Sequence, residues 1–202
     1  SFRNASPFIP VYILVRSNLV ALQLKRIMAD RLGGIFNLRF LTFPDLLDQM
    51  DRLRGSKAGK LPPEAGSLIV EKLKNEGKIP EYFREISGRS GFSDSILRTI
   101  SDLAEGGCDP DCASELSRSS EYRSLHRRAR AAVDIFCSFR RESVREGEDI
   151  HARFARAALS GKPLDGPLFA YGFYDFNELQ IRLLTSISGS GREDLLMAAW
   201  EE

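Results

Sequence analysis

The stretch Pro10-Val11-Tyr12-Ile13-Leu14-Val15-Arg16-Ser17-Asn18 decides the fold class of this chain. Its five central residues are all aliphatic or aromatic, which is typical of a strand buried on both faces of a parallel sheet. A polar turn follows, and then a helical pattern that ends at Gly33-Gly34. The apolar positions expected to face the sheet are Leu19, Val20, Leu22, Leu24, Ile27, Met28 and Leu32. The sequence therefore predicts a strand, a turn and a helix.

Further strands are predicted on either side of a long central region. Residues 38–43 form a second apolar run, followed by a helix after Pro44-Asp45, and this unit implies a parallel sheet with a crossover helix. Residues 168–173 and 195–199 are further expected strands, separated by a helix that Asp175 caps with Glu178 at its third position. We therefore expect an α/β fold whose sheet is formed by the two chain ends.

The central region has a helical pattern instead. One helix is expected to begin with Ser93 as N-cap and to end at Gly106-Gly107, and the longest is expected over residues 121–144. No strand-like alternation occurs between residues 46 and 160. These patterns predict a discontinuous α/β domain, residues 1–45 with 163–202, interrupted by a helical insertion subdomain of residues 46–162.

Composition excludes several classes of protein. The chain has 202 residues, with 29 Lys and Arg against 28 Asp and Glu, so it is neither a disordered tail nor a strongly basic chromatin-type protein. No apolar run approaches the roughly 20 residues of a membrane span. Three cysteines, an odd number, favour a reducing compartment. We expect a soluble, cytoplasmic chain, and its start at Ser1 without Met suggests a piece of a longer protein.

Motifs for bound cofactors are incomplete. The run Gly55-Ser56-Lys57-Ala58-Gly59-Lys60 has three residues between its glycines where a P-loop has four, and Leu61 follows the Lys, so we interpret it as a surface loop. Cys108, Cys112 and Cys137 fall short of the four ligands of a zinc or cluster site. Neither histidine accompanies a nucleophile elbow. We expect no metal and no cofactor.

Arginines are concentrated in one part of the chain. Residues 118–156 contain ten arginines, Arg127 and Arg128 among them, against six acids. Such a local excess fits contact with a phosphate backbone. It equally fits a solvated helix face with ion pairs, and the sequence leaves both interpretations open.

Three segments carry a family resemblance: residues 11–18, residues 41–46 and residues 168–180. In this order they resemble conserved motifs of superfamily 1 DNA helicases of the UvrD/RecB type, and more closely their inactivated relatives, the AddB-like subunits of helicase-nucleases. The first resembles motif Ia, and the second resembles the following Thr-Phe-His segment with Pro44 in place of His. The third resembles the Walker B segment, with Tyr171-Gly172 in place of its acidic pair. The residues of this degenerate Walker B segment are Tyr171, Gly172, Asp175, Asn177 and Gln180.

The resemblance implies a RecA-like domain whose helical insertion corresponds to the 1B subdomain. Such a domain would bind DNA, as a single strand or a duplex end, beside a helicase or nuclease partner subunit in double-strand-break repair and recombination. The DNA-binding residues it implies, together with the arginines, are Arg16, Ser17, Asn18, Thr42, Arg127 and Arg128. Family members usually carry a nuclease domain, which we expect beyond residue 202.

Loss of the acidic pair implies loss of catalysis. In active members a carboxylate helps to hold Mg²⁺ and its neighbour positions the attacking water, and Tyr171 and Gly172 can do neither. We therefore expect no ATP hydrolysis and no enzymatic activity from this segment. The alternative function is a protein-interaction scaffold that holds a motor or nuclease partner without binding DNA. Positive charge around Asn18 and Thr42 would favour DNA binding, and an apolar patch on the helical subdomain would favour the scaffold.

Overall fold

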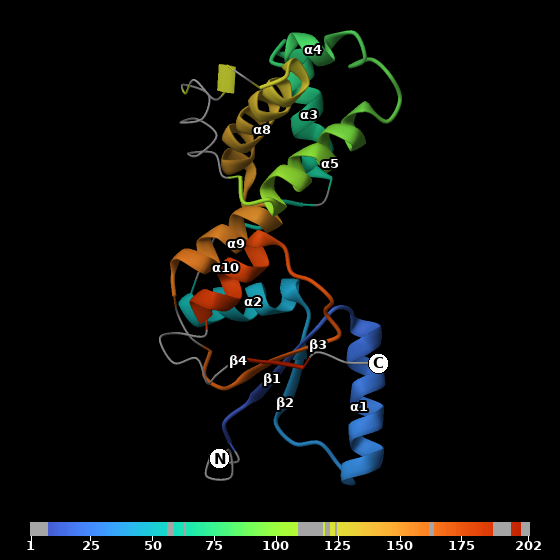
Figure 1. Ribbon diagram of the computed structural model, residues 1–202, viewed down its shortest axis with the longest axis vertical. Coiled ribbons are helices and arrows are strands. Elements are labelled where there is room, and N and C mark those ends of the chain that lie inside the picture. Colours follow the sequence, from blue (N-terminus) through green and yellow to red (C-terminus); the bar gives the residue numbers. More distant parts are fainter. Residues whose placement is uncertain are drawn as a thin grey trace. The chain divides into compact units, whose positions relative to one another are not determined.

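The chain folds into two compact units, which are described separately. The first comprises Ser1–Lys57 and Phe154–Glu202, and the second comprises Ala58–Arg153. Figure 1 shows the course of the chain in the computed structural model. The residues that the structure describes are 8–55, 59–62, 64–108, 119, 122–123, 125–161, 164–187 and 195–198, the last range as backbone only.

A parallel sheet lies in the first unit. Its strands are β1 (Val11–Val15), β2 (Leu38–Leu41), β3 (Leu168–Tyr171) and β4 (Leu195–Ala198), in the spatial order β2-β1-β3-β4 (Figure 1). All three pairings are parallel, with Leu14 opposite Leu41 and Ala170. The predicted α/β class is confirmed, and the sheet does combine the two ends of the chain. Because the strands are parallel, their carboxyl ends share one edge.

One face of the sheet carries the core of the first unit. The helices that pack on this face are α2 (Phe43–Arg54), the end of α9 (Ile150–Leu159) and α10 (Glu178–Ile187). Tyr12 and Leu14 of β1 and Leu168 and Ala170 of β3 contribute the sheet side of this core. In each strand the two core residues are two positions apart, because successive side chains of a strand point to opposite faces of the sheet.

The other face is covered less well than expected. It is on this side that α1 (Asn18–Leu32) lies (Figure 1), and among the helix's residues only Ala21 is buried. The predicted apolar face of α1 is wrong in part, since Leu19, Leu22, Ile27 and Leu32 are 49–66% exposed. Val11 and Ile13 of β1 are correspondingly only half-buried rather than enclosed. The helix does end where predicted, at Gly33 in the left-handed conformation.

Several elements begin or end away from their predicted bounds. The strand expected over residues 38–43 stops at Leu41 because Thr42 is the N-cap of α2. The strand expected over 168–173 stops at Tyr171, since Gly172 has a φ of 76°, outside the strand region. The strand expected over 195–199 is present as β4, and residue 199 lies outside the described residues.

The second unit is helical in its described part, apart from an isolated bridge between Lys60 and Glu148. Its helices are α3 (Ala65–Asn75), α4 (Glu81–Arg84), α5 (Phe92–Glu105) and α8 (Arg127–Glu146), which share one apolar core. The predicted Ser93 N-cap is wrong: Gly91 precedes α5, and the Ser93 hydroxyl donates to Glu71 at 3.0 Å. The predicted start of the longest helix at residue 121 is also wrong, because α8 begins after His126.

The unit boundaries differ from the predicted division at residues 45/46 and 162/163. The second unit is Ala58–Arg153, so α2 and the end of α9 belong with the sheet. The reason is their apolar faces: Leu46, Leu47 and Phe154 are buried in the core of the sheet unit. No helix in the described residues is long and apolar enough to cross a membrane.

Candidate nucleic-acid interface

The end of β1 supplies the first part of the candidate interface. Val15 is buried at 1% exposure, whereas Arg16 and Asn18 directly after it are exposed. Between them, the Ser17 side chain accepts a hydrogen bond from the Val20 amide at 3.4 Å and caps α1. Of the three predicted contact residues here, Arg16 and Asn18 present their side chains to solvent, and Ser17 serves the start of the helix.

Thr42, directly after β2, likewise caps the helix that follows it, α2. Its amide and its hydroxyl both donate to the Asp45 carboxylate, at 2.9 and 2.6 Å, which fixes the first turn of α2. Its backbone lies next to the carboxyl end of β1 because Leu41 pairs with Leu14. The N-termini of α1 and α2 therefore begin at the same edge, and helix N-termini favour anions.

A turn after β3 contributes an aromatic group that the sequence did not single out. Phe173 and Phe176 stack at 4.9 Å, and both meet the ring of Phe43 edge-on, at 5.6 and 6.2 Å. Tyr174 lies between these two anchors in the sequence and is 95% exposed. The available signal was a tyrosine between two phenylalanines, two residues after the glycine that ends the strand.

The Asn-x-x-Gln spacing of the Walker B-like segment has a structural role in this fold. The Asn177 amide donates to the Gln180 side chain at 3.2 Å, and the Gln180 amide donates to the Asn177 side chain at 2.9 Å. This reciprocal pair is a capping box at the start of α10. The predicted cap formed by Asp175 with Glu178 is therefore wrong. Asp175 is exposed, and the helix begins three residues after it.

Removing this capping box is expected to destabilise the first unit modestly. Asn177→Ala leaves the Gln180 amide without its side-chain acceptor, which typically costs about 1 kcal/mol. For a chain of this size the melting temperature should fall by about 2–4 °C. Asp175→Ala is the matched control, since that side chain has no hydrogen bond among the described residues. An equal fall in both variants, measured by circular dichroism, would contradict the capping box.

Charge at the edge is mixed rather than uniformly positive. Arg16 is the exposed cation, while Asp45 and Asp175 are acidic, Asp45 being engaged with Thr42. No group of three or more His, Cys, Asp or Glu side chains in the described residues is arranged to hold a metal ion. Tyr171, half-buried, and Gly172 occupy the end of β3. Among the described residues, the chemistry available at this edge is stacking and hydrogen bonding, with the guanidinium of Arg16 for phosphate.

Arg127 and Arg128 belong to the second unit, at the first turn of α8. Both are exposed, and His126 caps the helix by accepting from the Arg128 amide at 3.3 Å. Cys108 is partly buried and Cys137 is buried, where desolvation raises the pKa of the Cys137 thiol. Cys112 and residues 56–58 lie outside the described residues.

Some arginines of the stretch 118–156 form ion pairs within the fold, and others are left unpaired, so both interpretations of the stretch apply in part. Arg140 pairs with Asp149, Arg156 with Asp51 and Arg145 with Glu142. Five others have no ion pair in the part of the chain that the structure describes: Arg123, Arg127, Arg128, Arg130 and Arg141. Part of the stretch is thus structural, and part is available to a ligand.

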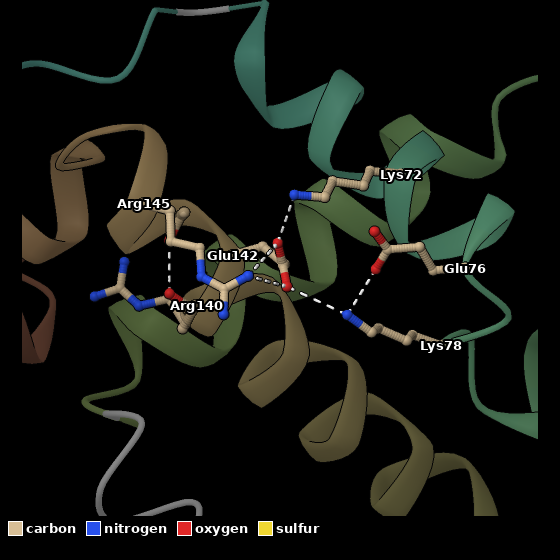
Figure 2. Close-up of polar contacts among 7 residues, drawn as sticks. Lys72, Glu76, Lys78, Arg140, Glu142 and Arg145 are labelled. Atoms are coloured by element: carbon tan, nitrogen blue, oxygen red, sulfur yellow. Dashed lines mark hydrogen bonds and ion pairs between the residues drawn. The ribbon is translucent and has the colours of Figure 1, made fainter.

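Glu142 is the centre of a charged network in the second unit (Figure 2). Its side chain is 6% exposed and pairs with Lys72 of α3 at 2.8 Å, and with Lys78 and Arg145 at 3.3 Å each. The hydrogen bond from Lys72, followed by that from Lys78, lowers the pKa of Glu142 to about 2 against desolvation, which acts to raise it. This carboxylate joins α3 and α8.

The network predicts a pH-dependent stability. The folded-state pKa of Glu142 lies below its ordinary 4.5, so the carboxylate stabilises the fold above that pH, and the contribution is lost as the pH falls toward 2. Glu142→Gln should therefore lower the melting temperature by a few degrees at pH 7, with the difference from wild type shrinking below pH 4.5. Glu85→Gln, at an exposed site, is the control. A difference that stays constant from pH 7 to 3 would contradict the network.

The candidate interface thus consists of Arg16, Asn18, Thr42 and Tyr174 at the carboxyl edge of the sheet. The strand register brings Arg16, Asn18 and Thr42 to this edge, and the phenylalanine anchors hold the turn that bears Tyr174. Comparison with known proteins assigns no family: no protein-family model matches the chain, and no curated protein matches it.

Proposed function

We propose that this chain is a catalytically inactive helicase-like domain, RecA-like in fold, that binds DNA at the carboxyl edge of its sheet. The observation that carries the proposal is Tyr174, 95% exposed on a turn anchored by two partly buried phenylalanines, at the edge where Arg16 and Asn18 are also exposed. The setting we propose is an AddB-like subunit that acts with a helicase or nuclease partner in double-strand-break repair and recombination.

The physical case rests on how single strands are bound. Proteins that bind single-stranded DNA without sequence preference combine aromatic side chains, on which bases stack, with cationic groups that contact phosphates. Tyr174 supplies the first kind of group and Arg16 the second. The N-termini of α1 and α2 add backbone dipoles that favour phosphate, and ligands of open α/β sheets bind at the carboxyl ends of strands. A weak, sequence-independent contact is therefore expected.

Absence of catalysis is part of the proposal. The end of β3 carries Tyr171-Gly172, and neither side chain can hold Mg²⁺ or orient a water for attack on a phosphate. Gly172 is moreover required by the backbone, since its φ of 76° disfavours a side chain there. DNA binding by this segment would accordingly be independent of ATP.

The test is fluorescence anisotropy of a labelled oligo-dT titrated with the full chain at two salt concentrations. Arg16→Ala with Tyr174→Ala should weaken binding about 10-fold or more, because stacking on one aromatic contributes about 1–3 kcal/mol. Loss of one phosphate contact should also reduce the salt dependence, by roughly 0.7 in the logarithmic slope.

Arg31→Ala with Phe36→Ala is the matched control. It removes an exposed arginine and an exposed phenylalanine from the C-terminal end of α1 and the turn after it, away from the carboxyl edge. Equal losses in the two double variants would reject the edge as the binding surface. No binding of wild type at low salt would reject DNA binding by this chain.

A second function is favoured by one observation, the exposed apolar side chains of α1. The solvent-exposed surface of this helix is apolar because it carries the side chains of Leu19, Leu22, Ile27 and Leu32. Such exposure is typical of protein contact surfaces. The second candidate is therefore a scaffold that holds a protein partner through α1. The apolar surface lies on the sheet unit, not only on the helical unit where a scaffold was expected to show it.

A further inference from the structure

A pocket of about 240 Å³ lies in the second unit, between the start of α4 and the first two turns of α8. It is lined by Pro80, Glu81, Tyr82, Tyr122, Arg127, Arg130, Ala131 and Asp134. The four residues from α8 recur at intervals of one, three or four, so they share one face of that helix.

Both tyrosines of the pocket are held in place by their neighbours. The Tyr122 hydroxyl donates to the Asp134 carboxylate at 2.6 Å, and burial, with this hydrogen bond, raises the pKa of Tyr122 to about 12. The ring therefore stays neutral at physiological pH. The Tyr82 ring meets the buried Phe83 edge-on, with centroids 5.2 Å apart. Two oriented aromatic rings thus contribute to one small pocket.

Two guanidinium groups line the same pocket. Arg127 is exposed and Arg130 is half-buried, and neither has an ion pair within the described ranges. Guanidinium groups bind phosphate through paired, charge-assisted hydrogen bonds, whereas they repel a cationic ligand. Of the two carboxylates in the lining, Asp134 accepts the Tyr122 hydroxyl and keeps its negative charge, and Glu81 is exposed. The lining is thus balanced in formal charge, and what it offers an anionic ligand is the directional hydrogen bonds of its two guanidinium groups.

We propose that this pocket binds one nucleoside 5′-phosphate unit, with its ring against Tyr82 and Tyr122 and its phosphate on Arg127 and Arg130. The unit is either a free nucleotide or the 5′-phosphorylated end of a DNA strand, since both present a planar ring and a phosphate. The volume of about 240 Å³ lies below the ~300–1,000 Å³ of most ligand pockets, so the bound portion of the ligand is small, no more than a single nucleotide unit. The site is independent of the sheet edge.

Calorimetric titration of the full chain with deoxyadenosine 5′-monophosphate tests the site directly. Wild type should bind, and Arg127→Ala with Arg130→Ala should weaken binding about 10-fold or more by removing two charge-assisted contacts. Tyr82→Ala should weaken it as well. Arg128→Ala, an adjacent exposed arginine that does not line the pocket, should bind as wild type does. Melting curves of each variant establish that it is folded.

A second arm separates the two sources of the ligand. Oligo-dT with a 5′-phosphate is compared with oligo-dT with a 5′-hydroxyl, and a preference for the phosphorylated strand that disappears in Arg127→Ala with Arg130→Ala identifies a strand end. Binding of the free nucleotide alone identifies a soluble nucleotide. Arg16→Ala with Tyr174→Ala should leave nucleotide binding unchanged, so failure at the sheet edge and failure at this pocket are distinguishable.

Three results would overturn the proposal. The first is that neither the nucleotide nor the 5′-phosphorylated strand binds to the folded chain. The second is that inorganic phosphate competes as strongly as the nucleotide, which would mean that the rings contribute nothing. The third is that Arg128→Ala weakens binding as much as the pocket variants do.

Discussion

Gly166→Ala is expected to destabilise the sheet unit severely. A Cβ atom at this position would stand 1.9 Å from the carbonyl oxygen of Pro10 and 3.0 Å from its carbonyl carbon. Both are backbone atoms at the start of β1, so no side-chain rotation can relieve the clash. The turn before β3 would have to withdraw from β1, weakening the 2.9 Å hydrogen bond from the Tyr12 amide to the Pro167 carbonyl and the contact of the Tyr12 hydroxyl with Asp165.

The cost should reach about 3 kcal/mol or more, the upper part of the range for overpacked sites. In a chain of this size that corresponds to a fall of about 6–12 °C in melting temperature. Gly88→Ala is the matched control, because a Cβ there meets nothing within 4 Å and its φ is not positive. If the Gly166→Ala protein has the same melting temperature as the Gly88→Ala control, β1 and the turn before β3 do not approach each other this closely.

Phe43→Ala should have the second large effect. Phe43 is buried at 7% exposure, and its ring contacts Phe154 at 5.5 Å as well as Phe173 and Phe176. Truncating a buried phenylalanine costs about 3–5 kcal/mol, through lost burial and the cavity left behind. We expect a fall of about 6–20 °C in melting temperature, measured by calorimetry or circular dichroism.

The same variant links the core to the candidate interface. Phe43 anchors the turn that bears Tyr174, so oligo-dT binding should weaken at temperatures where Phe43→Ala is still folded. Phe36→Ala, which removes an exposed ring from the same unit, is expected to change neither property measurably. Unchanged DNA affinity in a folded Phe43→Ala protein would show that the position of Tyr174 does not depend on the aromatic anchors.

Part of the candidate interface could not be predicted from residue type. Thr42, Ser17 and Asn177 were attributed to DNA contact or to a nucleotide motif, yet each begins a helix in this fold. Ser, Thr and Asn are common in both settings because their short polar side chains bond nearby amides as readily as a ligand. Residue type alone could not separate the two uses. Tyr174, in contrast, is exposed while Phe173 and Phe176 on either side of it pack against Phe43, which is distant in sequence.

Three features of the fold could be predicted from the amino-acid sequence alone: the succession of strands and helices in the first unit, the parallel pairing of the strands and the helical nature of the middle. It could do so because period and punctuation are local: an apolar run such as Val11–Val15, a glycine stop such as Gly33, and connections too long for a hairpin.

Which side chains are buried or paired within the fold, and which can still contact a ligand, became known from the tertiary structure. Leu19 and Leu22 have helical spacing but stay exposed among the described residues, whereas Leu46 and Leu47 of α2 pack on the sheet and join its unit. Arg140 meets an acid nine residues away in sequence, and Arg130 meets none in the described structure. Burial and pairing depend on what lies opposite in space, and that information is spread over the whole chain.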